Sequence, residues 1–219
     1  RTPSDPYFSD LWGMDNTDNV DIDAPEAWEA GVGGPAVTVA VIDSGVAQHP
    51  DLAGLDPASL LRGRTVGLLM LLDVLEHLVD PWRALVAMRG WLSPASRVLA
   101  SLPNLRNLQT LERLASGAFD YEASGVLDVT HLRFFTRASL VRLFEETGYE
   151  VVATECLLHS APAELSVRRD GSALVARSLV LRCATLDDLE ELHSPQIVLE
   201  ARLPREGERG WAPREPRAW

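Results

Sequence analysis

Carboxylates stand directly after two apolar runs that have the composition of buried strands. The first run, Val37 to Ile42, is rich in β-branched residues and leads into Asp43-Ser44-Gly45. The second run, Leu68 to Leu72, leads into Asp73. A carboxylate placed at the end of a strand can orient a base or hold a ligand, so each run defines a candidate site.

Histidines supply the second requirement, because they take up and release protons near neutral pH. His77 and His131 are the most plausible bases in the later part of the chain, and Glu76 directly precedes His77. Each has a structural alternative. His77 can brace its helix, His131 can bond a loop carbonyl, and Asp73 can cap the N-terminus of a helix.

Strands and helices must position these residues, and the pattern alternates between them after residue 66. Asp80 and Pro81 start a predicted helix with an apolar stripe at Leu85, Met88 and Leu92. A second predicted helix follows Thr136 and stops at Gly148. Further strands are predicted over residues 97–102, 149–158 and 173–183. This alternation predicts an α/β domain with a mainly parallel sheet.

Charge divides the chain at the same place. Residues 1–60 hold eleven carboxylates and one arginine, a net charge of −10, whereas the other residues carry −2 of the total of −12. A step of this size indicates a boundary or a separate origin. We expect the join within residues 55–65, which have no clear period.

Composition excludes several partners. A net charge of −12 argues against a nucleic-acid partner, which needs a basic face. No apolar run approaches the roughly 20 residues of a membrane span, and no targeting segment is visible. Cys156 and Cys183 are too few for a disulfide framework. These features predict a cytoplasmic protein with free thiols.

Four ordered motifs in the first 54 residues carry a resemblance. They are Asp5-Pro-Tyr-Phe-Ser-Asp-Leu-Trp-Gly13, Asp23-Ala-Pro-Glu-Ala-Trp28, Val39-Ala-Val-Ile-Asp-Ser-Gly-Val46 and His49-Pro-Asp-Leu52. The segment resembles the opening of subtilisin-like serine proteases. The resemblance implies that Asp43 is the aspartate of a catalytic triad, and it gives Asp5 and Asp51 weaker standing as calcium ligands.

The rest of that triad is absent from the sequence. A triad needs a histidine base and a hydroxyl nucleophile beside its aspartate, and no His-Gly-Thr-His or Gly-Thr-Ser-Met segment occurs. Proteolysis is therefore not expected. A rival interpretation takes Val-Ile-Asp-Ser-Gly as a reduced loop for a methyl donor, although it lacks the second and third glycines of such loops.

A second resemblance covers residues 66–183. It rests on Leu71-Leu-Asp-Val-Leu-Glu-His-Leu78, Asp80-Pro-Trp82, Ser101-Leu-Pro-Asn104, Phe119-Asp-Tyr-Glu122, Leu127-Asp-Val-Thr-His-Leu-Arg-Phe-Phe-Thr136 and Phe144-Glu-Glu-Thr-Gly-Tyr149. The region resembles class I S-adenosylmethionine-dependent methyltransferases, in particular small-molecule enzymes akin to the ubiquinone-biosynthesis O-methyltransferases. This resemblance implies a partial Rossmann-like sheet made of the later strands of the family.

The methyltransferase resemblance also implies roles for individual residues. Asp73 and Glu76 would border the donor, together with Pro103 and Asn104. His77 would face the cleft. The loop with His131 and Arg133 would close over a small-molecule acceptor.

The donor side departs from the family. Its Gly-rich loop and its ribose-binding acidic residue lie upstream of the matching region, where this chain has the protease-like segment. We therefore expect a methyltransferase-like protein with impaired binding of S-adenosylmethionine. The alternatives are a non-enzymatic chimeric or truncated chain and, third, a protease fragment.

These expectations define four parts. Residues 1–54 form an irregular acidic segment with one strand, and residues 55–65 form the junction. The methyltransferase-like α/β domain spans residues 66–195. A tail without clear period, residues 196–219, is expected to be disordered. The strand near Val37 to Ile42 could dock on the open edge of the Leu68 strand, which would otherwise be exposed.

Overall fold

A computed structural model describes residues 39–42, 63–157, 166–167, 174–176, 179–181 and 185–205. The chain divides into two units, Arg1–Thr38 and Val39–Trp219, and all described residues belong to the second unit. Asp5, Asp43 and Asp51 lie outside the described residues.

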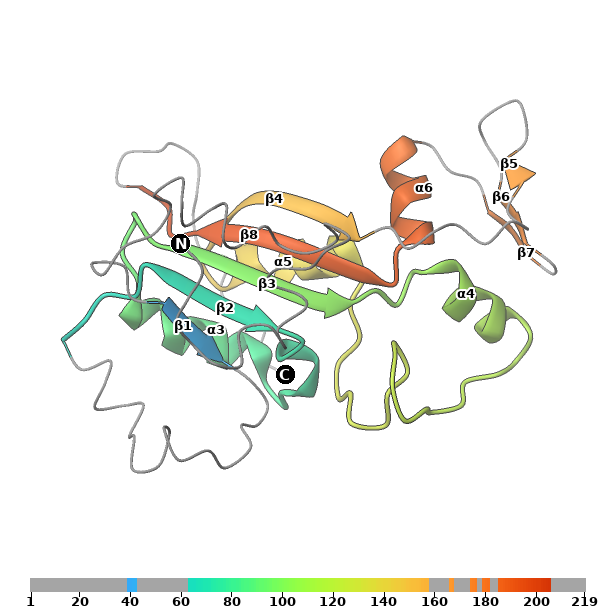
Figure 1. The fold of residues 1–219 in the computed structure, drawn as a ribbon, viewed down its shortest axis with the longest axis horizontal. Helices are drawn as coiled ribbons and strands as arrows, with labels where there is room; N and C mark the ends of the chain where they lie inside the picture. The colour runs from blue at the N-terminus through green and yellow to red at the C-terminus, as the bar shows by residue number, and fades with distance from the viewer. Residues whose placement is uncertain are drawn as a thin grey trace, which may run out of the picture. The chain divides into compact units, whose positions relative to one another are not determined.

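A five-stranded sheet organises this unit (Figure 1). Its order is β1 (Val39–Ile42), β2 (Leu68–Leu72), β3 (Arg97–Pro103), β8 (Gln196–Arg202) and β4 (Glu150–Leu157). The pairs β1–β2 and β2–β3 are parallel, whereas β8 runs antiparallel to both of its neighbours. The α/β fold class is therefore confirmed, and β8 is the strand of this sheet that runs against the others.

Strand β1 docks on the edge of β2, as expected. The register pairs Val39 with Leu68 and Ile42 with Leu71, in parallel. A strand that is 29 positions away from its partner in the sequence thus covers the backbone groups that β2 would otherwise expose. The predicted strand began at Val37; Val37 and Thr38 lie outside the described residues, and β1 is described from Val39 to Ile42.

Strand β8 corrects the predicted tail. Residues 196–219 were expected to be disordered, but Gln196–Arg202 lies between β3 and β4 in the sheet. Ile197, Leu199 and Ala201 are fully buried on one face. The alternation of these side chains is a strand signal, and pairing on both sides fixes it. The domain therefore extends beyond residue 195.

The helices begin at polar caps. Asp80 caps α3 (Pro81–Met88) by accepting from the backbone N–H of Arg83, as predicted. Thr136 and Ser139 form a capping box at the start of α5 (Arg137–Glu146). The predicted stripe continued to Leu92, but α3 ends at Met88 and a 3₁₀ helix, η4 (Arg89–Trp91), follows.

Two helices were not predicted. Asn107 caps α4 (Leu108–Ala115), and a capping box of Thr185 and Asp188 starts α6 (Leu186–His193). Leu108 and Leu192 form a small buried cluster from these two helices. Each helix is eight residues long, as α3 is, but neither has the Asp-Pro start that marked α3 in the sequence.

The main core lies between the sheet and helices α3 and α5. Most of its buried residues belong to helices α3 and α5 and to strands β2, β3 and β8. They include Leu69, Leu71, Leu85, Val98, Leu140, Phe144 and Leu199. Leu68 and Met70 on the other face of β2 are half-buried, and Leu72 is 38% exposed. The expectation that β2 is covered on both faces was therefore only partly correct.

A second, three-stranded sheet replaces the last predicted strand. Residues 173–183 were expected to form one strand, but β6 (Leu174–Ala176) and β7 (Leu179–Leu181) pair antiparallel, with β5 (Ser166–Val167) beside β6. Ala176 pairs with Leu179, so the run turns back on itself. These residues have the same preference for strand structure whether they form one long strand or two short paired ones. Only the observed pairing distinguishes the two arrangements.

Candidate functional site

Asp73, which directly follows β2, has a strained backbone conformation. Its φ of 53° is the only positive value at a non-glycine residue in the described part of the chain. Aspartate tolerates this left-handed region better than most residues, at a cost of about 1 kcal/mol or more. The backbone N–H of Asp73 donates to the carbonyl of Ser101 on β3 at 3.0 Å, which holds the turn.

The side chain of Asp73 turns toward β3 and β8. Its Oδ1 accepts from the amide of Gln196 and lies 3.4 Å from the hydroxyl of Ser101. The next helix, η3 (Leu75–His77), has Val74 at its N-cap and no side-chain cap. Asp73 therefore does not cap this helix, and its carboxylate is available at the edge of the sheet.

Glu76 is the most unusual side chain of this region. It lies in η3 with 1% of its surface exposed, and neither carboxylate oxygen has a hydrogen-bond partner. Burial raises the pKa of the Glu76 carboxyl to about 7; its own backbone opposes the rise and the charge of Asp73 adds to it. Perturbed carboxyls of this kind concentrate at functional sites.

The backbone of Glu76 anchors a loop that carries His131. Its carbonyl accepts from the N–H of Leu132 at 2.8 Å and from that of Arg133 at 2.9 Å. The His131 side chain is 9% exposed, and its Nδ1 lies 3.0 Å from the carbonyl oxygen of Val126. Because a carbonyl can only accept, Nδ1 carries the proton and Nε2 keeps its lone pair.

His77 repeats this arrangement. Its Nδ1 lies 3.3 Å from the carbonyl oxygen of Thr130, and its ring centroid lies 4.9 Å from that of His131. The carbonyl contact expected as the alternative for His131 is thus present, whereas His77, which was expected to brace its own helix, contacts a loop carbonyl 53 positions away. Both contacts are compatible with chemistry, since they leave the second ring nitrogen of each histidine available.

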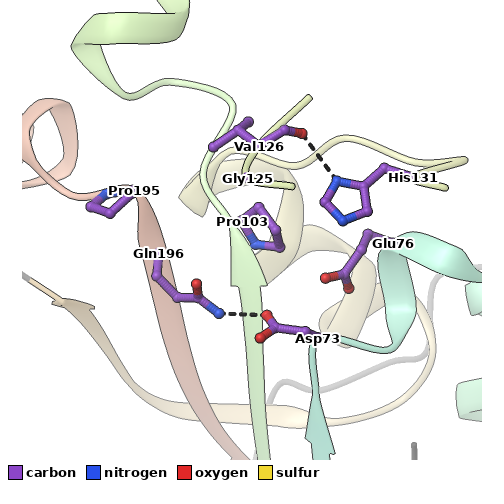
Figure 2. Close-up of a pocket in the computed structure, with 8 residues that line it drawn as sticks. All are labelled: Asp73, Glu76, Pro103, Gly125, Val126, His131, Pro195 and Gln196. Atoms are coloured by element: carbon purple, nitrogen blue, oxygen red, sulfur yellow. Dashed lines mark hydrogen bonds between the residues drawn. The ribbon is translucent and has the colours of Figure 1, made fainter. Parts of the chain in front are cut away.

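A pocket brings four of the predicted residues together (Figure 2). Its volume is about 230 Å³, and it is lined by Asp73, Glu76, Pro103, Gly125, Val126, His131, Pro195 and Gln196. Asp73 follows β2 and Pro103 ends β3, so the pocket lies at the carboxyl ends of two parallel strands. Open α/β sheets bind ligands at this edge.

Three of the predicted residues do not line the pocket: His77, which was expected to face the cleft, Asn104 and Arg133. Asn104 is completely buried, and its amide donates to the carbonyls of Glu191 at 2.7 Å and Ser194 at 2.8 Å. Its side chain therefore joins β3 to α6 and does not line the pocket. Arg133 is exposed, and its guanidinium donates to the carbonyls of Leu132 and Val79.

Gln196 and Pro195 were missed. Gln196 belongs to the segment that was expected to be disordered, and Pro195 is the last residue of the predicted domain. Both line the pocket opposite Glu76 and His131 (Figure 2). The alternating apolar residues Ile197, Leu199 and Ala201 were the available signal. They predict a strand directly after Gln196, which would place its side chain at a strand end.

None of the helices in the described ranges is both long and apolar enough to cross a membrane.

Proteases match short stretches of this chain. Furin-1 of Xenopus laevis is 41% identical over 59 residues, which are 26% of this chain and 8% of furin-1. The Protease 2 small chain of Achromobacter lyticus is 43% identical over 51 residues, which are 23% of this chain and 78% of that protein. The similarity thus concerns about a quarter of the chain, which spans under a tenth of the furin relatives.

Methyltransferases match a larger part of the chain than the proteases do. A solved S-adenosylmethionine-dependent methyltransferase of Archaeoglobus fulgidus is 14% identical, with 81% of this chain and 79% of that chain covered and a TM-score of 0.46. The chain covers 57% of the length of two further solved methyltransferases. The sequence family described as "Methyltransferase domain" matches residues 9–154, well over half of the 219 residues. The chain belongs to this methyltransferase domain family.

Proposed function

We propose that this domain transfers a methyl group from S-adenosylmethionine to an oxygen of a small molecule. The family match supports methyl transfer. The pocket at the carboxyl ends of β2 and β3 is the observation that supports a small-molecule acceptor. A small acceptor suits a pocket of about 230 Å³, and a net charge of −12 disfavours a nucleic-acid acceptor.

The pocket fits only part of a donor and acceptor pair. Ligand clefts commonly measure about 300–1,000 Å³, so 230 Å³ accommodates the acceptor and the reacting end of the donor. The remainder of the donor would lie toward β1, whose last residue, Ile42, pairs with Leu71 beside Asp73. Asp73, which directly follows β2, would offer it a hydrogen bond at that edge.

The chain's own groups would orient the acceptor and remove its proton. When bound, the donor supplies a methyl group on a sulfonium, in line with the attacking oxygen. His131 is held by Val126 so that Nε2 can take the proton of the acceptor hydroxyl. The half-buried side chains of Pro103 and Val126 would help to exclude water around that oxygen.

The affinity for S-adenosylmethionine tests whether the lack of a Gly-rich loop impairs donor binding. After β1 the sequence supplies Asp43-Ser44-Gly45 and no second or third glycine, so few backbone N–H groups can approach the donor closely. We expect calorimetry with S-adenosylmethionine to give a Kd near 1 mM, or about −4 kcal/mol. Micromolar affinity would show that the loop is not needed and would contradict the impairment.

The role of His131 is tested by turnover. We expect His131→Asn to lower kcat for a phenolic acceptor by about 10²-fold or more, with the Kd of the donor unchanged, because only the proton acceptor is lost. His193→Asn is the matched control, since His193 lies on α6 and does not line the pocket. Equal kcat values for the two variants would remove His131 from the mechanism.

An inactive chimera is the second candidate. The protease matches favour it, because about a quarter of the chain is similar to furin-1 and to the Protease 2 small chain. The resemblance of residues 1–54 to subtilisin-like proteases would put that similarity before the methyltransferase-like part. The methyltransferase match begins at residue 9, however, and therefore includes most of the same residues. Independent genomes that lack an uninterrupted frame across residues 50–70 would support the chimera, and a recurring frame would oppose it. A peptidase assay is expected to show no cleavage, because the base and nucleophile are missing.

A further inference from the structure

We propose that Glu76, His77 and His131 form a binding site for a divalent transition-metal ion such as Zn²⁺. One ligand atom from each of the three side chains lies within 4.8 Å of the other two. Two imidazoles and one carboxylate are a ligand set that zinc and its neighbours in the first transition row prefer over the harder Mg²⁺ and Ca²⁺.

The unpaired carboxylate of Glu76 is the main evidence for a bound cation. Both of its carboxylate oxygens are inaccessible to solvent and lack a hydrogen-bond partner, whereas buried carboxylates are ordinarily paired. The carboxylate points into the pocket, toward which His131 also turns (Figure 2). A cation at this place would satisfy both oxygens.

The histidines are oriented as metal ligands usually are. In metal sites the ring nitrogen that does not bind the ion donates to a carbonyl or a carboxylate, which fixes the ring and its tautomer. Val126 provides this carbonyl to His131 and Thr130 provides it to His77. The two rings meet edge to face with their centroids 4.9 Å apart, and each keeps one nitrogen available.

Charge around the site favours a cation. Asp73 lines the same pocket as Glu76, which adds a second carboxylate near the proposed ion. The nearby cation, Arg133, directs its guanidinium to the carbonyls of Val79 and Leu132. Ligands at about 2.1 Å from one ion lie roughly 3.4 Å apart in a tetrahedron, so the three side chains need to close by about 1.4 Å at most.

The metal site does not depend on the proposed methyl transfer. If both are correct, His131 is a ligand in the loaded protein, and the ion would lower the pKa of a coordinated acceptor hydroxyl so that its proton passes to solvent water. The pocket would leave room for that oxygen as a further ligand. Binding is therefore measured with the metal alone, without donor or acceptor, so that a failure of either proposal is seen separately.

The experiment titrates the full chain, stripped with a chelator, with Zn²⁺ and separately with Mg²⁺ by calorimetry. We expect one Zn²⁺ per chain with a micromolar or lower Kd, Mg²⁺ at least tenfold weaker, and a rise in Tm with Zn²⁺. Glu76→Gln and His77→Asn are expected to weaken Zn²⁺ binding by tenfold or more. The control His193→Asn should bind as the wild type does.

Two outcomes overturn the proposal: no Zn²⁺ uptake by the wild type, or unchanged affinity in both Glu76→Gln and His77→Asn. The first of these variants is isosteric, and circular dichroism checks its fold. If both variants unfold, the visible spectrum of the wild type loaded with Co²⁺ decides. Nitrogen and oxygen ligands support the site, whereas a thiolate charge-transfer band would assign the ion to cysteine and overturn it.

Discussion

Two buried polar residues a short distance apart in the fold have opposite hydrogen-bonding states. Asn104 is fully buried, and its side chain bonds Glu191, Ser194 and the N–H of Arg106. Glu76 is equally buried and has no partner for either oxygen. A satisfied buried group stabilises a fold, while an unsatisfied one costs free energy and persists where function retains it. This contrast separates the structural residue from the functional candidate.

The structural role of Asn104 can be measured directly. Asn104→Ala removes the donors of two buried carbonyls, so we expect the free energy of unfolding to fall by about 2–4 kcal/mol. Gln109→Ala on exposed α4 surface is the control and should change it by under about 0.5 kcal/mol. Urea denaturation of both variants makes the comparison, and a neutral Asn104→Ala would contradict the assigned role.

At the scale of elements, a single glycine ends α5 and starts β4. Gly148 has a φ of 92°, which places it in the left-handed region that favours glycine. A Cβ at this position would lie 2.7 Å from the guanidinium of Arg89, which comes from η4. The turn therefore depends on glycine for its conformation, and a Cβ would in addition require the Arg89 side chain to shift.

A glycine-to-alanine series separates these two effects. Gly90 has no positive φ and open space around it, Gly117 has a φ of 86° in open space, and Gly148 has both constraints. We expect alanine to be neutral or slightly stabilising at Gly90, to cost about 1 kcal/mol at Gly117 and to cost more, about 1–3 kcal/mol, at Gly148. Thermal unfolding ranks the three, and an equal cost at all positions would refute the account.

At the scale of the whole unit, the last described strand joins parts that are far apart in the sequence. Strand β8 pairs with β3 on one side and with β4 on the other, and Gln196 at its start reaches Asp73. The sheet and the pocket therefore both need the C-terminal part of the described chain. Loss of packing in β8 should affect stability more than a similar change on the sheet edge.

Leu199 tests this dependence. Leu199→Ala leaves a cavity at a fully buried position of β8, and we expect a loss of about 2–5 kcal/mol in the free energy of unfolding. Val152→Ala on the edge strand β4, where Val152 is 48% exposed, should cost under about 1 kcal/mol. Chemical denaturation of both proteins provides the values, and similar losses would show that β8 is not central.

The local patterns of the sequence were sufficient for much of the fold and for part of the site. The apolar run before Asp73, the cap at Asp80 and the stop at Gly148 predicted a strand, a helix start and a helix end that the structure confirms. Asp73, Glu76, Pro103 and His131 were chosen from the sequence, and all four line the pocket. Such signals are local, because caps, turns and apolar periods act over a few residues.

Pairing and burial were decided only by the tertiary structure. Sequence alone did not place β8 between β3 and β4, split residues 173–183 into two strands, or turn the amide of Asn104 away from the pocket. These outcomes depend on contacts between residues up to 123 positions apart, such as Gln196 and Asp73. The isolation of the Glu76 carboxylate likewise arises from what packs around η3, because no local pattern records whether a side chain will find a partner.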